Sequence, residues 1–429
     1  MTDRLLIKHG RVIDPANNRD EVCDVLIEEG RISEVGHMSP AVEKSVQRTI
    51  DARDRLVTPG LIDIHVHFRE PGDEEEETIA SGSQAAVAAG FTSVVCMPNT
   101  KPAIQNETDI EFVHRKGRQA RKTHVYVMGA ITANREGKEL AEMGMMSEAG
   151  AVGFTDDGMG VQDPAVMQRA LKYAKMFDKV VAQHCPDNSY GGEGVMDSGY
   201  YSTILGLPGM DALGEEAMLW RDIQLVKRSQ VRYHAQHLST AGAVDLVREA
   251  KKQSLPLTCE VAPHHLLLTD EYIADYDTNY KVSPPLRSSK DVEALQQAIA
   301  DGTVDALATD HAPHLQSEKE LEFLTAPFGI ASLECALSLY IKALIEPGIL
   351  DWPALLRLMT ANPANIIGID KGTLSRGKQA DLTIIDPECE YRIDVNAFHS
   401  KSRNCPYHGW RVKGRVLKTI VGGEVRFER

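Results

Sequence analysis

Paired cysteines are missing from this chain. Its seven cysteines are scattered over 429 residues, their number is odd, and no Cys-x-x-Cys occurs. This pattern argues against a disulfide framework or a structural zinc knuckle. The sequence also lacks an apolar run long enough to span a membrane, and its first residues lack the apolar core of a signal peptide. We therefore expect a protein of the reducing cytoplasm.

The sequence also has fewer positively charged side chains than negatively charged ones. Lysine and arginine number 47 against 62 aspartates and glutamates, which gives a formal charge of −15. Such a balance argues against a nucleic-acid or anionic-membrane partner. A small anionic substrate remains compatible, because it needs only one or two local cations. The length allows one large barrel with a small appended domain.

The two ends of the chain are rich in short β-like segments, and the middle alternates strand-like runs with helical patterns. The flanks, 1–57 and 370–429, are predicted to pair into one small β-sandwich domain; two unrelated hairpins are the alternative. The middle, 58–369, is predicted to form an α/β barrel of the (β/α)8 type. The expected strands are 61–67, 92–98, 124–131, 151–156, 179–184, 231–237, 256–262 and 304–309. The expected helices are 76–89, 105–121, 163–177, 211–228, 240–253, 289–300 and 331–345, with 187–210 as a loop over the strand ends.

Five of these eight expected strands end on a side chain that can bind a metal. His65 and His67 alternate by two, so both imidazoles face the same side of one strand. A barrel of this type carries its chemistry at the carboxyl ends of its strands. The pattern therefore predicts a metal centre, with zinc favoured by imidazole and carboxylate ligands. The further candidates at strand ends are Asp157, His184, His237 and Asp310.

Two neighbours of these candidates need a separate interpretation. Asp156 and Asp157 are adjacent, and the sequence alone does not separate a metal-bridging carboxylate from a supporting one. His234 lies three residues before His237, so it should point to the opposite face and be structural. No lysine occurs at this strand end.

Such a centre indicates hydrolysis. A metal lowers the pKa of bound water towards about 7 and polarises the carbonyl under attack. Asp310 could hold the metal and also exchange a proton with the attacking water.

Three donors near the expected metal could bind an anionic substrate. Arg69 follows the histidine pair, Asn99 ends the second strand, and His314 lies four residues after Asp310. A guanidinium can bind a carboxylate through two parallel hydrogen bonds. Phe328 and Gly329 are interpreted either as a wall beside a ring or as a tight turn. The acidic run 74–77 is expected to open the helix 76–89, where carboxylates complement the helix N-terminus.

Several motifs together resemble the dihydroorotases of the amidohydrolase superfamily. They are Asp63-Ile-His-Val-His-Phe-Arg-Glu-Pro-Gly72, Met97-Pro-Asn-Thr100, Phe154-Thr-Asp-Asp-Gly158, Lys281-Val-Ser-Pro-Pro-Leu-Arg287 and Ala308-Thr-Asp-His-Ala-Pro-His314. The resemblance covers nearly the whole chain. It implies reversible, zinc-dependent hydrolysis of (S)-dihydroorotate to N-carbamoyl-L-aspartate in pyrimidine synthesis, with one or two zinc ions and two favoured.

The resemblance also implies a role for each matching residue. His65, His67 and Asp310 would hold one zinc, His184 and His237 a second, and Asp157 would bridge them, as in relatives that lack the carboxylated lysine. Asp310 would shuttle the proton. The substrate would contact His67, Arg69, Asn99, Ser283, His314, Phe328 and Gly329. A homodimer, and association with an aspartate transcarbamoylase, are further expectations.

One position departs from the family pattern. Ser283 stands where an asparagine is usual, and serine there also occurs in hydantoinase-like relatives. A hydantoinase or dihydropyrimidinase is therefore the neighbouring interpretation, although Arg69 and Asn99 favour a ring that carries a carboxylate. A third is a non-catalytic scaffold for aspartate transcarbamoylase, which the complete ligand set disfavours.

Overall fold

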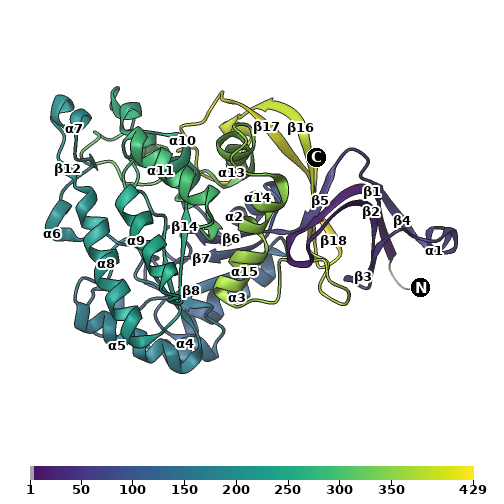
Figure 1. Ribbon diagram of the computed structural model, residues 1–429, viewed down its shortest axis with the longest axis horizontal. Helices are drawn as coiled ribbons and strands as arrows, with labels where there is room; N and C mark the ends of the chain where they lie inside the picture. The colour runs from purple at the N-terminus through teal and green to yellow at the C-terminus, as the bar shows by residue number, and fades with distance from the viewer. Residues whose placement is uncertain (1–3) are drawn as a thin grey trace.

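The terminal β-domain and the barrel lie beside each other in the computed structural model, which describes residues 4–429 (Figure 1). The first three residues, which belong to the expected segment 1–57 and to the start of the chain, lie outside the described residues. The barrel with its helices fills the left of Figure 1, and the terminal strands stand at its right. This arrangement confirms the predicted fold class.

Both ends of the chain contribute to the terminal sheet. Its strand order is β18-β17-β16-β5-β1-β2-β3, with β4 paired to β1. The two halves join where β5 and β16 run antiparallel, with Leu56 opposite Ile385 and Pro59 opposite Leu382. The alternative of two unrelated hairpins is therefore wrong. The strands are β1 (Arg4–Asp14), β2 (Arg19–Glu28), β3 (Arg31–Gly36), β4 (Arg48–Asp51), β5 (Leu56–Pro59), β16 (Leu382–Arg392), β17 (Arg411–Val421) and β18 (Glu424–Glu428), with the short helix α1 (Pro40–Ser45) between β3 and β4.

Eight parallel strands form the barrel, at the places the sequence predicts. They are β6 (Leu61–Val66), β7 (Phe91–Cys96), β8 (His124–Gly129), β9 (Gly153–Phe154), β10 (Val180–Gln183), β13 (Tyr233–Ala235), β14 (Leu257–Val261) and β15 (Ala306–Leu307). A bridge between Val66 and His311 closes the ring from the first strand to the last. Strands covered on both faces are apolar along nearly their whole length, which explains why they are readable in the sequence.

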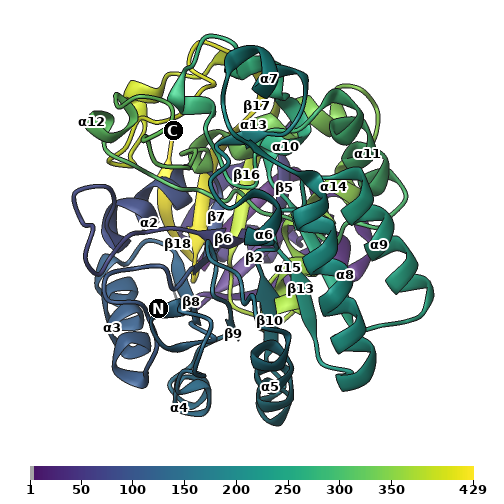
Figure 2. The same cartoon turned by 90° about the vertical axis from the view of Figure 1, so that its left-hand side faces the viewer.

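Helices surround the barrel, as Figure 2 shows. Each buries one stripe: in α9 the buried residues Ala243, Val244, Val247 and Ala250 recur at helical spacing. The principal helices are α2 (Ile79–Ala88), α3 (Glu107–Ala120), α4 (Met143–Glu148), α5 (Pro164–Ala174), α8 (Ala212–Ser229), α9 (Ala241–Lys252), α10 (Pro263–Leu267), α11 (Ser289–Ala300), α13 (Ala336–Tyr340), α14 (Trp352–Met359) and α15 (Ala361–Ile367).

Two expectations about elements need correction. Helix α2 begins at Ile79, because Thr78 caps it and its side chain accepts from the Ser81 amide, so the acidic run 74–77 lies before the helix. Segment 187–210 is partly regular rather than a loop. It contains α6 (Asn188–Gly191), α7 (Tyr200–Leu205) and a parallel ribbon of β11 (Met196–Asp197) and β12 (Gly209–Met210).

Within the described residues no helix has both the length and the apolar character that a membrane crossing requires. Each of the seven cysteines there is free.

Candidate active site

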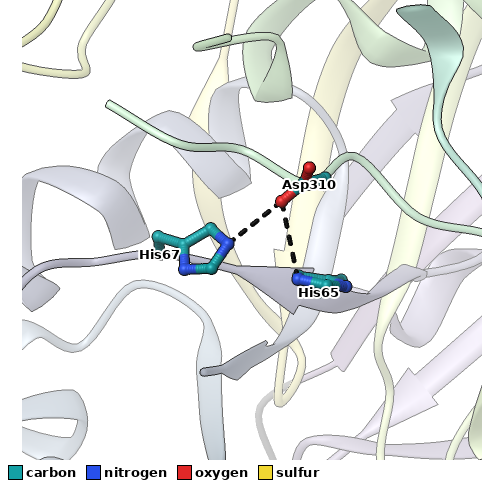
Figure 3. Close-up of side chains that lie close together, drawn as sticks. All are labelled: His65, His67 and Asp310. Atoms are coloured by element: carbon teal, nitrogen blue, oxygen red, sulfur yellow. Dashed lines mark hydrogen bonds and ion pairs between the residues drawn. The ribbon is translucent and has the colours of Figure 1, made fainter. Parts of the chain in front are cut away.

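The six predicted metal ligands meet at one end of the barrel. His65 lies in β6, His67 directly follows it, and the other four stand just after four more strands: Asp157 after β9, His184 after β10, His237 after β13 and Asp310 after β15. All six are buried, with at most 5% of each residue exposed. Figure 3 shows the Asp310 carboxylate between the rings of His65 and His67.

The spacing of the ligand atoms fits bound divalent cations. Asp310 Oδ1 lies 3.0 Å from His67 Nε2 and 3.5 Å from His65 Nε2. Asp157 Oδ1 lies 3.4 Å from His65 Nε2 and 3.5 Å from His237 Nε2, and its Oδ2 lies 3.6 Å from His67 Nε2. Ligand atoms around a tetrahedral zinc are about 3.3 Å apart, given bonds of about 2.0–2.1 Å. The Asp157 carboxylate thus faces both groups of histidines.

Unpartnered atoms at the centre support the same interpretation. His65 Nε2 and Asp157 Oδ1 are buried and have no hydrogen-bond partner. Buried polar atoms without a partner are costly and call for an ion or water between them. Imidazole and carboxylate donors are the set that zinc and similar cations prefer, so the residues present fit a metal centre.

The electrostatics favour the metal-binding forms of Asp157, Asp310 and His184. Burial by itself raises the pKa of Asp157 and Asp310, but the neighbouring imidazoles, His65 above all, outweigh it and lower both pKa values. Burial, with help from His237, lowers the pKa of His184 to about 3. Ionised carboxylates and a neutral imidazole are the forms that bind a cation.

The structure separates the two adjacent aspartates. The Asp156 carboxylate accepts the amides of Ile131 at 2.8 Å and Thr132 at 3.0 Å, and also the Thr132 hydroxyl. It therefore anchors the strand end, whereas Asp157 faces the histidines.

Sequence reasoning missed Glu260 in β14. Its carboxylate accepts from His65 Nδ1 at 2.7 Å and contacts His234 Nε2 at 3.1 Å. A carboxylate on the far nitrogen of a metal-ligating histidine fixes the ring and its tautomer. His234 therefore supports the centre from inside the barrel, and the expectation that it faces away is wrong. Strand β13 ends at Ala235, so strict alternation does not extend to His237. The available signal was a lone glutamate in the apolar run 257–261.

A cavity of about 490 Å³ lies above the ligands. Of the candidate residues, only His65 is absent from its wall, because it lies beneath the others. All the predicted substrate-contacting residues line it: His67, Arg69, Asn99, Ser283, His314, Phe328 and Gly329. Segment 187–210, which contains the ribbon of β11 and β12, contributes Asn188, Gly191 and Met210 to the same wall.

The donors in this cavity are interconnected. Asn99 Oδ1 accepts from His67 Nδ1 at 2.8 Å, so this amide orients a candidate metal ligand. Arg69 Nη2 lies 3.1 Å from His314 Nε2, and that nitrogen lies 2.8 Å from the Phe328 carbonyl oxygen.

Phe328 and Gly329 form part of the cavity wall, and neighbouring residues fix their position. A Cβ on Gly329 would lie 2.8 Å from Ala312 and 2.9 Å from His314, and its φ is +149°, so only glycine fits. Lys319 Nζ donates to the Pro327 carbonyl at 2.9 Å and the Gly329 carbonyl at 3.2 Å. Burial lowers the pKa of Lys319 to about 7.

Comparison with known proteins gives two kinds of likeness. The amidohydrolase family model matches residues 56–426. The dihydroorotase of Pelotomaculum thermopropionicum is 49% identical over 98% of both chains, and that of Geobacter metallireducens is 47% identical over 99% of this chain and 100% of its own. Among solved structures, an L-hydantoinase from Arthrobacter aurescens superposes with a TM-score of 0.88 at 24% identity, covering 99% of this chain and 96% of its own. That structural likeness shows the fold.

Proposed function

Because this chain belongs to the amidohydrolase family and, within it, to the dihydroorotases, we propose that it hydrolyses (S)-dihydroorotate reversibly to N-carbamoyl-L-aspartate in pyrimidine biosynthesis. One observation of the structure carries the proposal. Six side chains that could bind a metal lie at the floor of a cavity whose wall presents Arg69, Asn99 and His314. This pairing suits a cyclic amide that carries a carboxylate.

We assign two zinc ions to the centre. His65, His67 and Asp310 would hold one, His184 and His237 the other, and Asp157 would bridge them. The two oxygens of Asp157 support this, because Oδ1 faces His65 and His237 while Oδ2 faces His67. When bound, the metal would supply an activated water and a Lewis acid for the amide carbonyl.

The protein's own residues provide proton transfer and substrate binding. Asp310 takes a proton from the attacking water and passes it to the ring nitrogen as the carbon–nitrogen bond breaks. Arg69, Asn99 and His314 bind the substrate carboxylate. Ser283 contacts the ring, and Phe328 with Gly329 limits its position.

A panel of three cyclic amides tests the proposal. The zinc-loaded protein is assayed with dihydroorotate, hydantoin and dihydrouracil, before and after chelation. Chelator-sensitive turnover of dihydroorotate alone is the expected result. Preference for the two uncharged rings would replace the proposal with a hydantoinase, and zinc-bound protein inactive on all three would favour the scaffold.

Three further proposals concern the location and the assembly of the protein. Seven free cysteines favour a reducing cytoplasm. The homodimer and the association with aspartate transcarbamoylase stay predictions, and sedimentation of the protein alone and mixed with that enzyme tests both.

A further inference from the structure

An acidic side chain lies directly behind the carboxylate-binding residues. Glu76 belongs to the run 74–77, yet only 8% of it is exposed, whereas its neighbour Glu75 is exposed. A carboxylate is rarely buried unless it is paired. The partners of Glu76 are Arg69 and His314, which both line the cavity.

Glu76 contacts both of these groups through the same oxygen. Arg69 Nε lies 2.9 Å from Glu76 Oε2 in an ion pair, and His314 Nδ1 lies 3.6 Å from that oxygen. Arg69 Nε also donates to the Pro313 carbonyl at 3.0 Å. Glu318 adds a second carboxylate 3.7 Å from His314 Nδ1.

The geometry places Glu76 outside the substrate's space. Arg69 and His314 line the cavity, but Glu76 does not. Its contact is with Nε of the guanidinium, whereas the terminal nitrogen Nη2 lies beside His314 Nε2 at 3.1 Å. The Glu76 backbone is fixed as well, because the Ser402 hydroxyl donates to its carbonyl at 2.8 Å.

A buried cation needs a fixed counter-charge. Burial lowers the pKa of the Arg69 guanidinium, and Glu76 is the carboxylate that most strongly opposes this effect. Breaking such a buried pair leaves an uncompensated charge that moves or takes up water. Arg69 would then lose its orientation relative to His314.

We propose that Glu76 is a positioning residue, which holds Arg69 and His314 at the separation that a substrate carboxylate requires. The inference rests on the proposed function, because it assigns a carboxylate to the substrate. Glu76 touches neither substrate nor metal, so its effect is on the binding of carboxylate-bearing ligands. Bonds made equally in the ground state and the transition state change KM and leave kcat unchanged.

Three variants test this role: Glu76→Gln, Glu76→Ala and the matched control Glu75→Gln, which makes the same charge change on the exposed neighbour. For each, we would measure zinc content, Tm, and KM and kcat for dihydroorotate. Calorimetric binding of orotate, a planar ring with the same carboxylate, provides a readout independent of turnover. Glutamine keeps the size of the side chain and a carbonyl oxygen beside Arg69 but lacks the charge, so its effect should be smaller than that of alanine.

The expected result is a KM raised about tenfold in Glu76→Gln and further in Glu76→Ala, as befits loss of a charge-assisted contact. Orotate affinity should fall in parallel, while kcat, zinc content and the Glu75→Gln control stay at wild-type values. An unchanged KM in Glu76→Ala would overturn the proposal, as would a lowered KM, which would make Glu76 a competitor of the substrate. A fall in kcat alone, or loss of zinc, would also overturn it. Failure of the wild type to hydrolyse dihydroorotate would instead overturn the proposed function.

Discussion

Three residues at the bottom and side of the cavity adopt backbone angles that L-amino acids rarely take. The φ angles of Arg69, His237 and Asp310 are +58°, +29° and +48°. Each such residue costs about 1–3 kcal/mol and persists only where its surroundings impose it. All three lie within a few residues after the end of a barrel strand. Their backbone angles turn the side chains towards the mouth of the barrel. The sequence predicts these residues because each stands at the end of an apolar run, but it contains no sign of their backbone angles.

Asp310→Asn tests the proton shuttle. The amide keeps the shape and one oxygen but cannot accept a proton, so kcat should fall at least about a hundredfold. Zinc content and Tm measured together with kcat separate the chemistry from folding. Near-normal turnover would remove Asp310 from this role.

Glu260→Gln tests the support of His65. Losing the carboxylate behind a metal-bound histidine should weaken zinc affinity about 10- to 100-fold, measured by competition with a chelator. Exposed Glu293→Gln is the control and should bind zinc like the wild type. Equal affinities in the two variants would contradict the assignment. Glu260 escaped prediction because its partner His65 is 195 residues away in the chain.

At the scale of elements, the barrel strands could be predicted because burial on both faces leaves uninterrupted apolar runs. The short elements of segment 187–210 could not be predicted, because side chains that are distant in the sequence hold them in place. Arg287 donates to Asp197 Oδ1 at 2.5 Å and to the Met210 carbonyl at 2.9 Å, which ties β11 and β12 to the loop before α11. The predicted start of α2 was wrong for a related reason: Glu76 and Glu77 precede the helix and contact residues from other parts of the chain, Arg69 and Ser400.

Arg287→Met should loosen this ribbon. Asp197 would lose its cation while still mostly buried, a change that costs about 3–5 kcal/mol when a buried pair is broken. Hydrogen exchange should accelerate in residues 195–210, and KM should rise because both Met210 and Arg287 line the cavity. The same substitution at exposed Arg376 serves as the control. Unaltered exchange in the ribbon would show that Arg287 does not anchor it.

At the scale of the whole molecule, the C-terminal part of the chain reaches the mouth of the barrel. Between β16 and β17, Asn404 is 3% exposed and accepts from the His314 amide at 3.1 Å. Its side-chain nitrogen donates to the carbonyls of Ala312 at 2.9 Å and Gly329 at 3.0 Å. The pairing of the two chain ends could be predicted from their shared β character, but these contacts could not, because they join residues 75 to 92 positions apart.

Asn404→Ala should therefore affect both stability and substrate binding. Three buried hydrogen bonds disappear and leave polar groups unpaired, for a loss of about 2–4 kcal/mol in the free energy of unfolding. We also expect KM for dihydroorotate to rise, with zinc content unchanged. Denaturant unfolding and steady-state kinetics measure the two effects, with exposed Asn396→Ala as the control. Wild-type stability and KM in Asn404→Ala would contradict both expectations.

The contacts of Asn404 limit how the chain of such an enzyme can be shortened, or its segments exchanged with those of relatives. A fragment ending near residue 369 would keep all six candidate metal ligands, yet it would lack the amide that holds His314 and Gly329 in place. Exchanging the terminal strands between relatives would then alter substrate preference without touching a single metal ligand. The C-terminal part of the chain and the barrel therefore determine the shape of the substrate cavity together.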